Sequence, residues 1–259
     1  MKRFARLSVL AATVVLFGSA ANASPVTFGL TNGSRSATAL FENSGGDLVV
    51  TLTNTSSADA MVPTDLLTAI FFDIAGSPTL TKISAVICPT CSILHPPATA
   101  TDPGPYGVGG EWAYKSSTSG VAFGGDYGLS STGLGIFGPG DLFSGANLSG
   151  PTDPAGPQYG LTPAGDNPST GNGGLNTPII KNQVIFTLGG FGNLDPSLTI
   201  SGLTFLYGTA LDEPSFSGTC IDCAPTPNIA STPEPTSLIL LGSGLVGAVR
   251  YRRRPGSQV

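Results

Sequence analysis

The sequence predicts an all-β protein: a single antiparallel β-sandwich or jelly-roll-like domain with long glycine-rich loops, followed by a short C-terminal membrane helix. Two observations predict this fold. Short segments rich in Val, Ile, Thr and Phe recur between turn residues. No stretch between the two termini shows a capped helical period, so the alternating helices of a parallel α/β fold are not expected.

The strand pattern is strongest toward the two ends of this domain. Five segments have high β propensity and turn residues at their boundaries: Asp47–Thr55, Leu66–Ile74, Pro78–Ile87, Asn182–Leu188 and Ser197–Tyr207. Weaker strands are expected at Val26–Leu30, Ala37–Glu42, Gly110–Lys115 and Gly135–Phe137. Pro63 favours a first helical turn just before the second strong strand.

The middle of the chain, Gly104–Gly174, is rich in glycine and proline and predicts loops connected by short strands. Its aromatic residues offer enough apolar area to dock these loops onto the sheets: Trp112, Tyr114, Phe123, Tyr127, Phe137 and Phe143. Disorder is the alternative for the same composition. We expect docking.

The N-terminus has the three parts of a secretory signal peptide. A basic region with Lys2, Arg3 and Arg6 precedes the apolar run Leu7–Phe17, and Ala21 and Ala23 belong to an A-x-A cleavage site. Residues 1–23 are therefore expected to be removed, and the exported β-rich domain would cover residues 24–223. A buried first helix is the alternative interpretation.

The C-terminus has a second, distinct pattern. A proline-rich linker at 224–232 leads to Pro233, Glu234 and Pro235, an apolar run to Val249, and then a basic cluster: Arg250, Arg252, Arg253 and Arg254. A helix over residues 236–251 would be about 24 Å long, slightly short of a hydrocarbon core of about 30 Å. The arginines should remain cytoplasmic and leave the domain outside.

This order of parts resembles the PEP-CTERM sorting signal, at residues 233–259. The resemblance implies processing by an exosortase in a Gram-negative bacterium, with transient membrane anchoring and then a cell-surface or extracellular location. Segments of the domain, such as Leu48–Thr55 and Gly110–Lys115, also look like a family of exosortase-dependent surface proteins. That family has no catalytic residues to carry over.

Removing both signals reveals a strongly acidic domain. Between Ser24 and Thr232 the chain has fifteen Asp and Glu and only four basic residues: Arg35, Lys82, Lys115 and Lys181. The net charge of this part is therefore −11. Nucleic acid and anionic membrane surfaces are therefore not expected as partners. Signal peptidase and exosortase are the partners that the two signals imply.

The four cysteines form two C-x-x-C pairs, Cys88 with Cys91 and Cys220 with Cys223. Export into an oxidising compartment predicts disulfides, either within each pair or between the pairs. A tetrahedral zinc site and a redox motif are the alternatives that the spacing allows.

Catalysis has little support in the sequence. His95 is the only histidine, and no G-x-S-x-G motif accompanies it, so we interpret it as a loop residue. Nothing in the spacing pairs two carboxylates as a glycosidase requires. We expect no enzymatic activity, no cofactor and no metal.

Trp112 and Tyr114 could lie on one face of a strand, two residues apart, and stack a sugar ring. Core packing is the alternative use of such a pair. The sequence thus predicts an exported, non-catalytic cell-surface or extracellular-matrix protein of the biofilm type. The second hypothesis is a secreted carbohydrate-binding or carbohydrate-active module, with extracellular polysaccharide as its partner.

Overall fold

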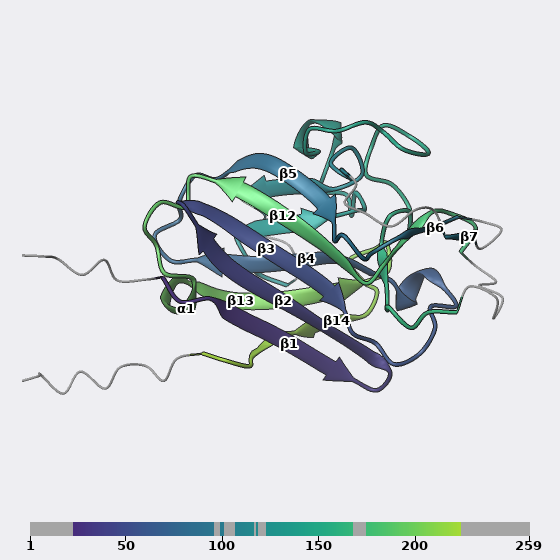
Figure 1. Cartoon of the computed structure of the whole chain (residues 1–259), viewed down its shortest axis with the longest axis horizontal. Helices are drawn as coiled ribbons and strands as arrows, with labels where there is room; N and C mark the ends of the chain where they lie inside the picture. Colours follow the sequence, from purple (N-terminus) through teal and green to yellow (C-terminus); the bar gives the residue numbers. More distant parts are fainter. Residues whose placement is uncertain are drawn as a thin grey trace, which may run out of the picture. The chain divides into compact units, whose positions relative to one another are not determined.

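The computed structural model describes residues 23–95, 99–100, 107–116, 118, 123–167 and 175–223, which form two β-sheets (Figure 1). Residues 1–22 of the expected signal peptide, the expected linker at 224–232 and the expected sorting segment at 233–259 lie outside the described residues. Within the described part, no helix has the length and apolar character needed to cross a membrane.

The first sheet is antiparallel throughout. Its strands, in spatial order, are β15 (Thr219–Cys220), β1 (Val26–Asn32), β2 (Arg35–Ser44), β3 (Asp47–Asn54), β12 (Gln183–Gly189) and β5 (Thr81–Ile87). In β3 every second residue is buried, as expected for a strand with one face on a core. Gly45 and Gly46 make the two-residue turn into β3, and both have positive φ, which a type I′ hairpin requires.

The second sheet is mixed. Its main path is β14 (Ser215–Ser217), β13 (Ile200–Tyr207), β4 (Leu67–Ile74), β10 (Leu161–Thr162), β11 (Ile179–Lys181), β6 (Ile93–His95) and β7 (Thr99–Ala100). On a branch, β9 (Tyr127–Ser130) pairs with β4, and β8 (Ala113–Ser116) pairs with β9. The β10–β11 pair is parallel, so the prediction of a wholly antiparallel fold is wrong there.

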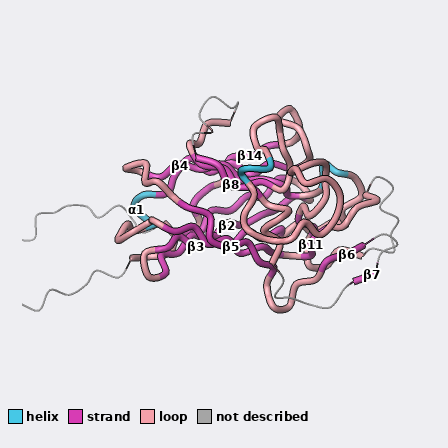
Figure 2. The backbone as a smooth tube through the Cα atoms, turned by 90° about the horizontal axis from the view of Figure 1, so that it is seen from above, coloured by secondary structure: helices cyan, strands magenta, loops and turns pink. Residues whose placement is uncertain are grey.

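One hydrophobic core joins the two sheets. Phe41 of β2 packs on Phe72 of β4 with ring centroids 5.1 Å apart, and both belong to a single buried cluster that draws on both sheets. Figure 2 shows the sheets from above as two layers, with β4 and β8 in one and β3 and β5 in the other. The mostly β architecture predicted from the sequence is confirmed.

The glycine-rich segment covers the outer face of the second sheet. Phe71, on the face of β4 opposite to Phe72, packs with Phe123 and Phe137 at ring distances of 5.8 and 6.2 Å. Trp112 and Phe143 instead enter the core between the sheets. Docking of this segment is therefore confirmed for its described residues. Burial on both faces explains why β4 is apolar along almost its whole length.

The strong strands and most of the weak ones occur where they were predicted, and a 3₁₀ turn, η1 (Pro63–Asp65), follows Val62. The strand predicted at Gly135–Phe137 is wrong. Leu134 and Gly135 have positive φ values of 51° and 71°, which places a turn there. The strand expected at Ser197–Tyr207 begins only at Ile200, because residues up to Thr199 form the short helix α1 (Pro196–Thr199). Asp195 is the N-cap residue of this helix.

Candidate binding pocket

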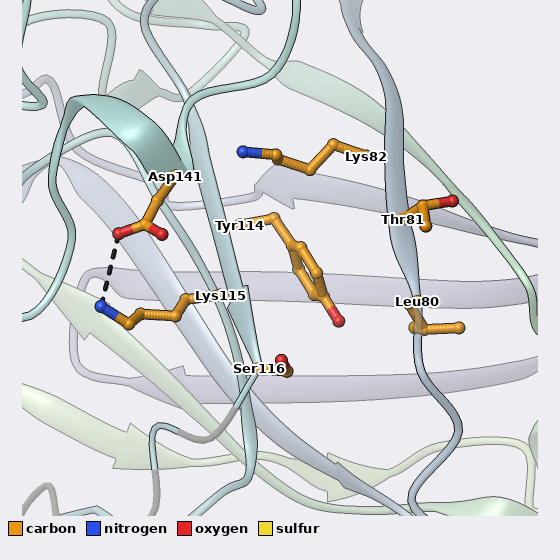
Figure 3. Close-up of a pocket in the computed structure, with 7 residues that line it drawn as sticks. All are labelled: Leu80, Thr81, Lys82, Tyr114, Lys115, Ser116 and Asp141. Carbon is orange, nitrogen blue, oxygen red and sulfur yellow. Dashed lines mark hydrogen bonds and ion pairs between the residues drawn. The ribbon is translucent and has the colours of Figure 1, made fainter.

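An open pocket lies between the edges of the two sheets. Among the described strands, β5 pairs only with β12, and β8 pairs only with β9, so each has one edge without a further strand. A third wall comes from the 3₁₀ turn η2 (Pro139–Asp141). The pocket has a volume of about 480 Å³ and is lined by Leu80, Thr81, Lys82, Tyr114, Lys115, Ser116 and Asp141 (Figure 3).

Two lysines from different sheets lie in this pocket. Lys82 of β5 donates from Nζ to the Gly140 carbonyl oxygen at 2.7 Å. Lys115 of β8 donates to the Ile136 carbonyl at 2.8 Å and approaches Asp141 Oδ2 at 3.4 Å. Both ammonium groups therefore hold the η2 turn, and with Asp141 they give the pocket an excess of one positive charge.

Tyr114 forms the inner wall of the pocket. Only 6% of the residue is exposed, and its hydroxyl oxygen is buried. The hydroxyl makes no hydrogen bond of ordinary geometry in the described structure, but the Ser116 side chain lies close enough to interact with it. Burial, together with the nearby Tyr127, raises the pKa of the Tyr114 phenol, so the hydroxyl remains protonated and able to donate. In Figure 3 the Tyr114 ring points away from the two ammonium groups, and its hydroxyl ends near Ser116.

The predicted sugar-stacking pair does not form, which corrects the interpretation of Trp112. Its indole is fully buried, lies 5.0 Å from the Phe186 ring between centroids, and donates from Nε1 to the Tyr159 carbonyl at 3.2 Å. Trp112 immediately precedes β8, and its side chain faces the core, so no ring face is left for a sugar. Tyr114 reaches the pocket as part of its wall and not as an exposed platform.

The cysteines pair locally. Cys88 is bonded to Cys91, and Cys220 and Cys223 are also disulfide-bonded, which leaves no free cysteine among the described residues. In the described structure no disulfide therefore joins the two pairs. No group of three or more His, Cys, Asp or Glu that could hold a metal ion occurs in the part of the chain that the structure describes.

Two buried carboxylates fasten loops. Glu111 Oε1 accepts from the backbone N–H groups of Leu148 and Ser149, and Asp166 Oδ1 accepts from that of Ala60 at 2.9 Å. Burial raises the pKa of each acid, and these backbone hydrogen bonds partly offset the rise. Each carboxylate thus holds a loop in place by hydrogen bonds, and its burial carries a free-energy cost of desolvation.

The remaining predicted residues lie at the edges of the described segments or outside them. His95 ends β6 and pairs with Thr99, so it lies in a short strand and not in a loop. Ala23 is the first described residue, whereas Ala21 lies outside. The residues of the sorting motif also lie outside: Pro233, Glu234, Pro235, Arg250, Arg252, Arg253 and Arg254.

Comparison with known protein families finds a PEP-CTERM protein-sorting motif at residues 231–254. The match contains the Pro-Glu-Pro sequence, the apolar run and the basic cluster, and it implies an exported protein that an exosortase processes. No curated protein and no solved structure matches the chain.

Proposed function

We propose that this protein is a non-catalytic protein of the bacterial cell surface or of a biofilm-type extracellular matrix. It would reach this location by export and exosortase sorting. The observation that carries the proposal is the PEP-CTERM motif at 231–254. It stands beside a signal-peptide pattern at residues 1–23, so both ends of the chain carry export information.

The described domain has features that suit this location. Its disulfide-bonded cysteines fit an oxidising compartment. The domain has two sheets around one core, which we class as a β-sandwich related to jelly rolls. Signal peptidase and exosortase are the proposed partners during export, with transient anchoring through residues 236–251.

A second candidate function is a carbohydrate-binding module. The observation that favours it is the open pocket at the edges of β5 and β8, with ammonium and hydroxyl groups in its walls. The Trp112 ring, which first suggested sugar binding, is buried and takes no part.

The sorting proposal is tested at the C-terminus of the mature protein. Mass spectrometry of surface-exposed protein from cells with an exosortase should find a terminus near Pro233 to Thr236. Replacing the four residues Arg250, Arg252, Arg253 and Arg254 with Ser should weaken the cytoplasmic stop and mislocalise the chain. The matched control replaces the same four with Lys, which keeps the charge and should keep the location.

Two results would contradict this proposal. One is an intact peptide covering residues 252–259 on surface-exposed protein. The other is normal localisation of the Ser variant, because the basic cluster would then have no role in sorting.

A further inference from the structure

We propose that the pocket between β5 and β8 binds a carboxylate-bearing sugar, such as one hexuronic acid unit of an acidic polysaccharide. The carboxylate would lie at the Lys82 and Lys115 ammonium groups, and the sugar hydroxyls toward Thr81 and Ser116. This inference rests on the second candidate function, and it is independent of the sorting proposal because binding at the pocket does not depend on the C-terminal motif.

The distribution of charge supports an anionic ligand. Between Ser24 and Thr232 only four residues are basic, and two of them, Lys82 and Lys115, line this one pocket. The rest of the domain is acidic and repels anions, so the pocket is an exception on its surface. With Asp141 included, the pocket has a net charge of +1. A carboxylate, with one negative charge, neutralises it, whereas a phosphate dianion would leave the occupied pocket with a net negative charge.

The ammonium groups retain hydrogen-bonding capacity for a ligand. Each lysine ammonium has three donors. Lys82 uses one on the Gly140 carbonyl, and Lys115 uses two, on the Ile136 carbonyl and on Asp141. The same contacts hold both lysines against η2, so the side chains are already positioned before a ligand arrives, which reduces the entropy lost on binding.

The opposite end of the pocket suits a sugar ring. Hydroxyls are present on Thr81 and Ser116, and Tyr114 contributes its ring, because its own hydroxyl is buried. Figure 3 shows both ammonium groups toward the Asp141 end of the pocket, with Asp141 drawn between them, and Thr81 and Leu80 toward the other end. A bare anion would use only the first end. A volume of about 480 Å³ lies within the usual range for small-ligand pockets.

The test is a calorimetric titration of the purified exported protein with D-glucuronate. D-glucose, acetate and inorganic phosphate are titrated in parallel. We expect one-site binding of glucuronate that weakens as salt rises, and much weaker binding of the other three. Glucuronate that fails to bind at millimolar concentration would overturn the proposal. Acetate or phosphate binding as tightly as glucuronate would also overturn it, because the site would then recognise charge alone.

Substitutions locate the binding. Lys82→Met and Lys115→Met keep the side-chain length and remove the charge, and each should weaken glucuronate binding about tenfold, the loss expected for one charge-assisted hydrogen bond. Lys82→Arg should retain most of the affinity. The matched control is Lys181→Met, because Lys181 donates to the Asp166 carbonyl and does not line the pocket.

Thermal melts check that each variant is folded. If Lys115→Met does not fold, Lys82→Met carries the test, because its only hydrogen bond recorded in the described structure is to Gly140. Glucuronate affinity that is unchanged in the folded Lys82→Met protein, or that falls equally in the Lys181→Met control, would contradict the assignment. A normally sorted protein that does not bind glucuronate would remove this inference and leave the sorting proposal standing.

Discussion

Glu111 is a buried carboxylate whose hydrogen bonds stabilise the fold and whose desolvation destabilises it. The residue is 3% exposed, and its Oε1 accepts two backbone N–H groups from the loop at Leu148 and Ser149. Glu111→Gln keeps an oxygen acceptor and removes the charge, whereas Glu111→Ala leaves both donors without this partner. We expect the Ala variant to lose about 1–3 kcal/mol in the free energy of unfolding, and the Gln variant to lose much less.

The pH dependence of these variants has a definite sign. Burial raises the pKa of Glu111 above 4.5, so the folded state holds its proton more tightly than the unfolded state. The stability from this group is present below pH 4.5 and is lost as pH rises through the higher folded pKa. Denaturant melts at several pH values should therefore show Glu111→Gln gaining relative to the natural protein as pH rises. A gain that shrinks with rising pH would contradict this.

The two disulfides act at the scale of a single turn. Cys88 and Cys91 are three residues apart, and the chain-entropy model gives about 2 kcal/mol for so short a loop, against about 4–5 kcal/mol for a bond between the two C-x-x-C pairs. Reductant opens both bonds, a loss of about 4 kcal/mol, and should therefore lower the midpoint of thermal unfolding by about 8–16 °C. Non-reducing peptide mapping provides the check, and a peptide that links Cys88 to Cys220 or Cys223 would contradict local pairing.

A strand could be predicted from the sequence when most of its stability comes from residues close together in the chain. β3 and β12 were predicted because alternating Val, Leu, Thr and Phe are visible in a few residues. β10 and β11 have two and three residues, and they exist because distant partners pair with them, as Leu161 does with Leu67. A short window contains no sign of such partners, so both strands were missed.

The candidate site depends on tertiary structure more than any strand does. Lys82 and Lys115 are 33 positions apart in the sequence and belong to different sheets, so no motif spacing connects them. One signal was available: basic residues are scarce in the exported domain, which makes each of them a candidate for function. The role of Trp112 was undecidable from sequence, because the same i, i+2 pattern fits a sugar platform and a core face.

The shared core makes a prediction for the molecule as a whole. Trp112 is the single tryptophan of the chain, it lies in the glycine-rich segment, and its ring packs on Phe186 of the first sheet. Because one core joins both sheets and this segment, they should unfold together. Tryptophan fluorescence and far-UV circular dichroism should give the same denaturation midpoint, and acrylamide should quench the folded protein poorly.

Phe186→Ala provides the matched perturbation for that prediction. The phenylalanine is fully buried, and its ring also packs on Phe143 of the glycine-rich segment at 5.8 Å. Truncation should cost about 3–5 kcal/mol and lower both midpoints by the same amount. A fluorescence transition that moves while the dichroism transition stays in place would show that the glycine-rich segment unfolds separately from the sheets. The glycine-rich segment would then be an appendage of the sheets and not part of their core.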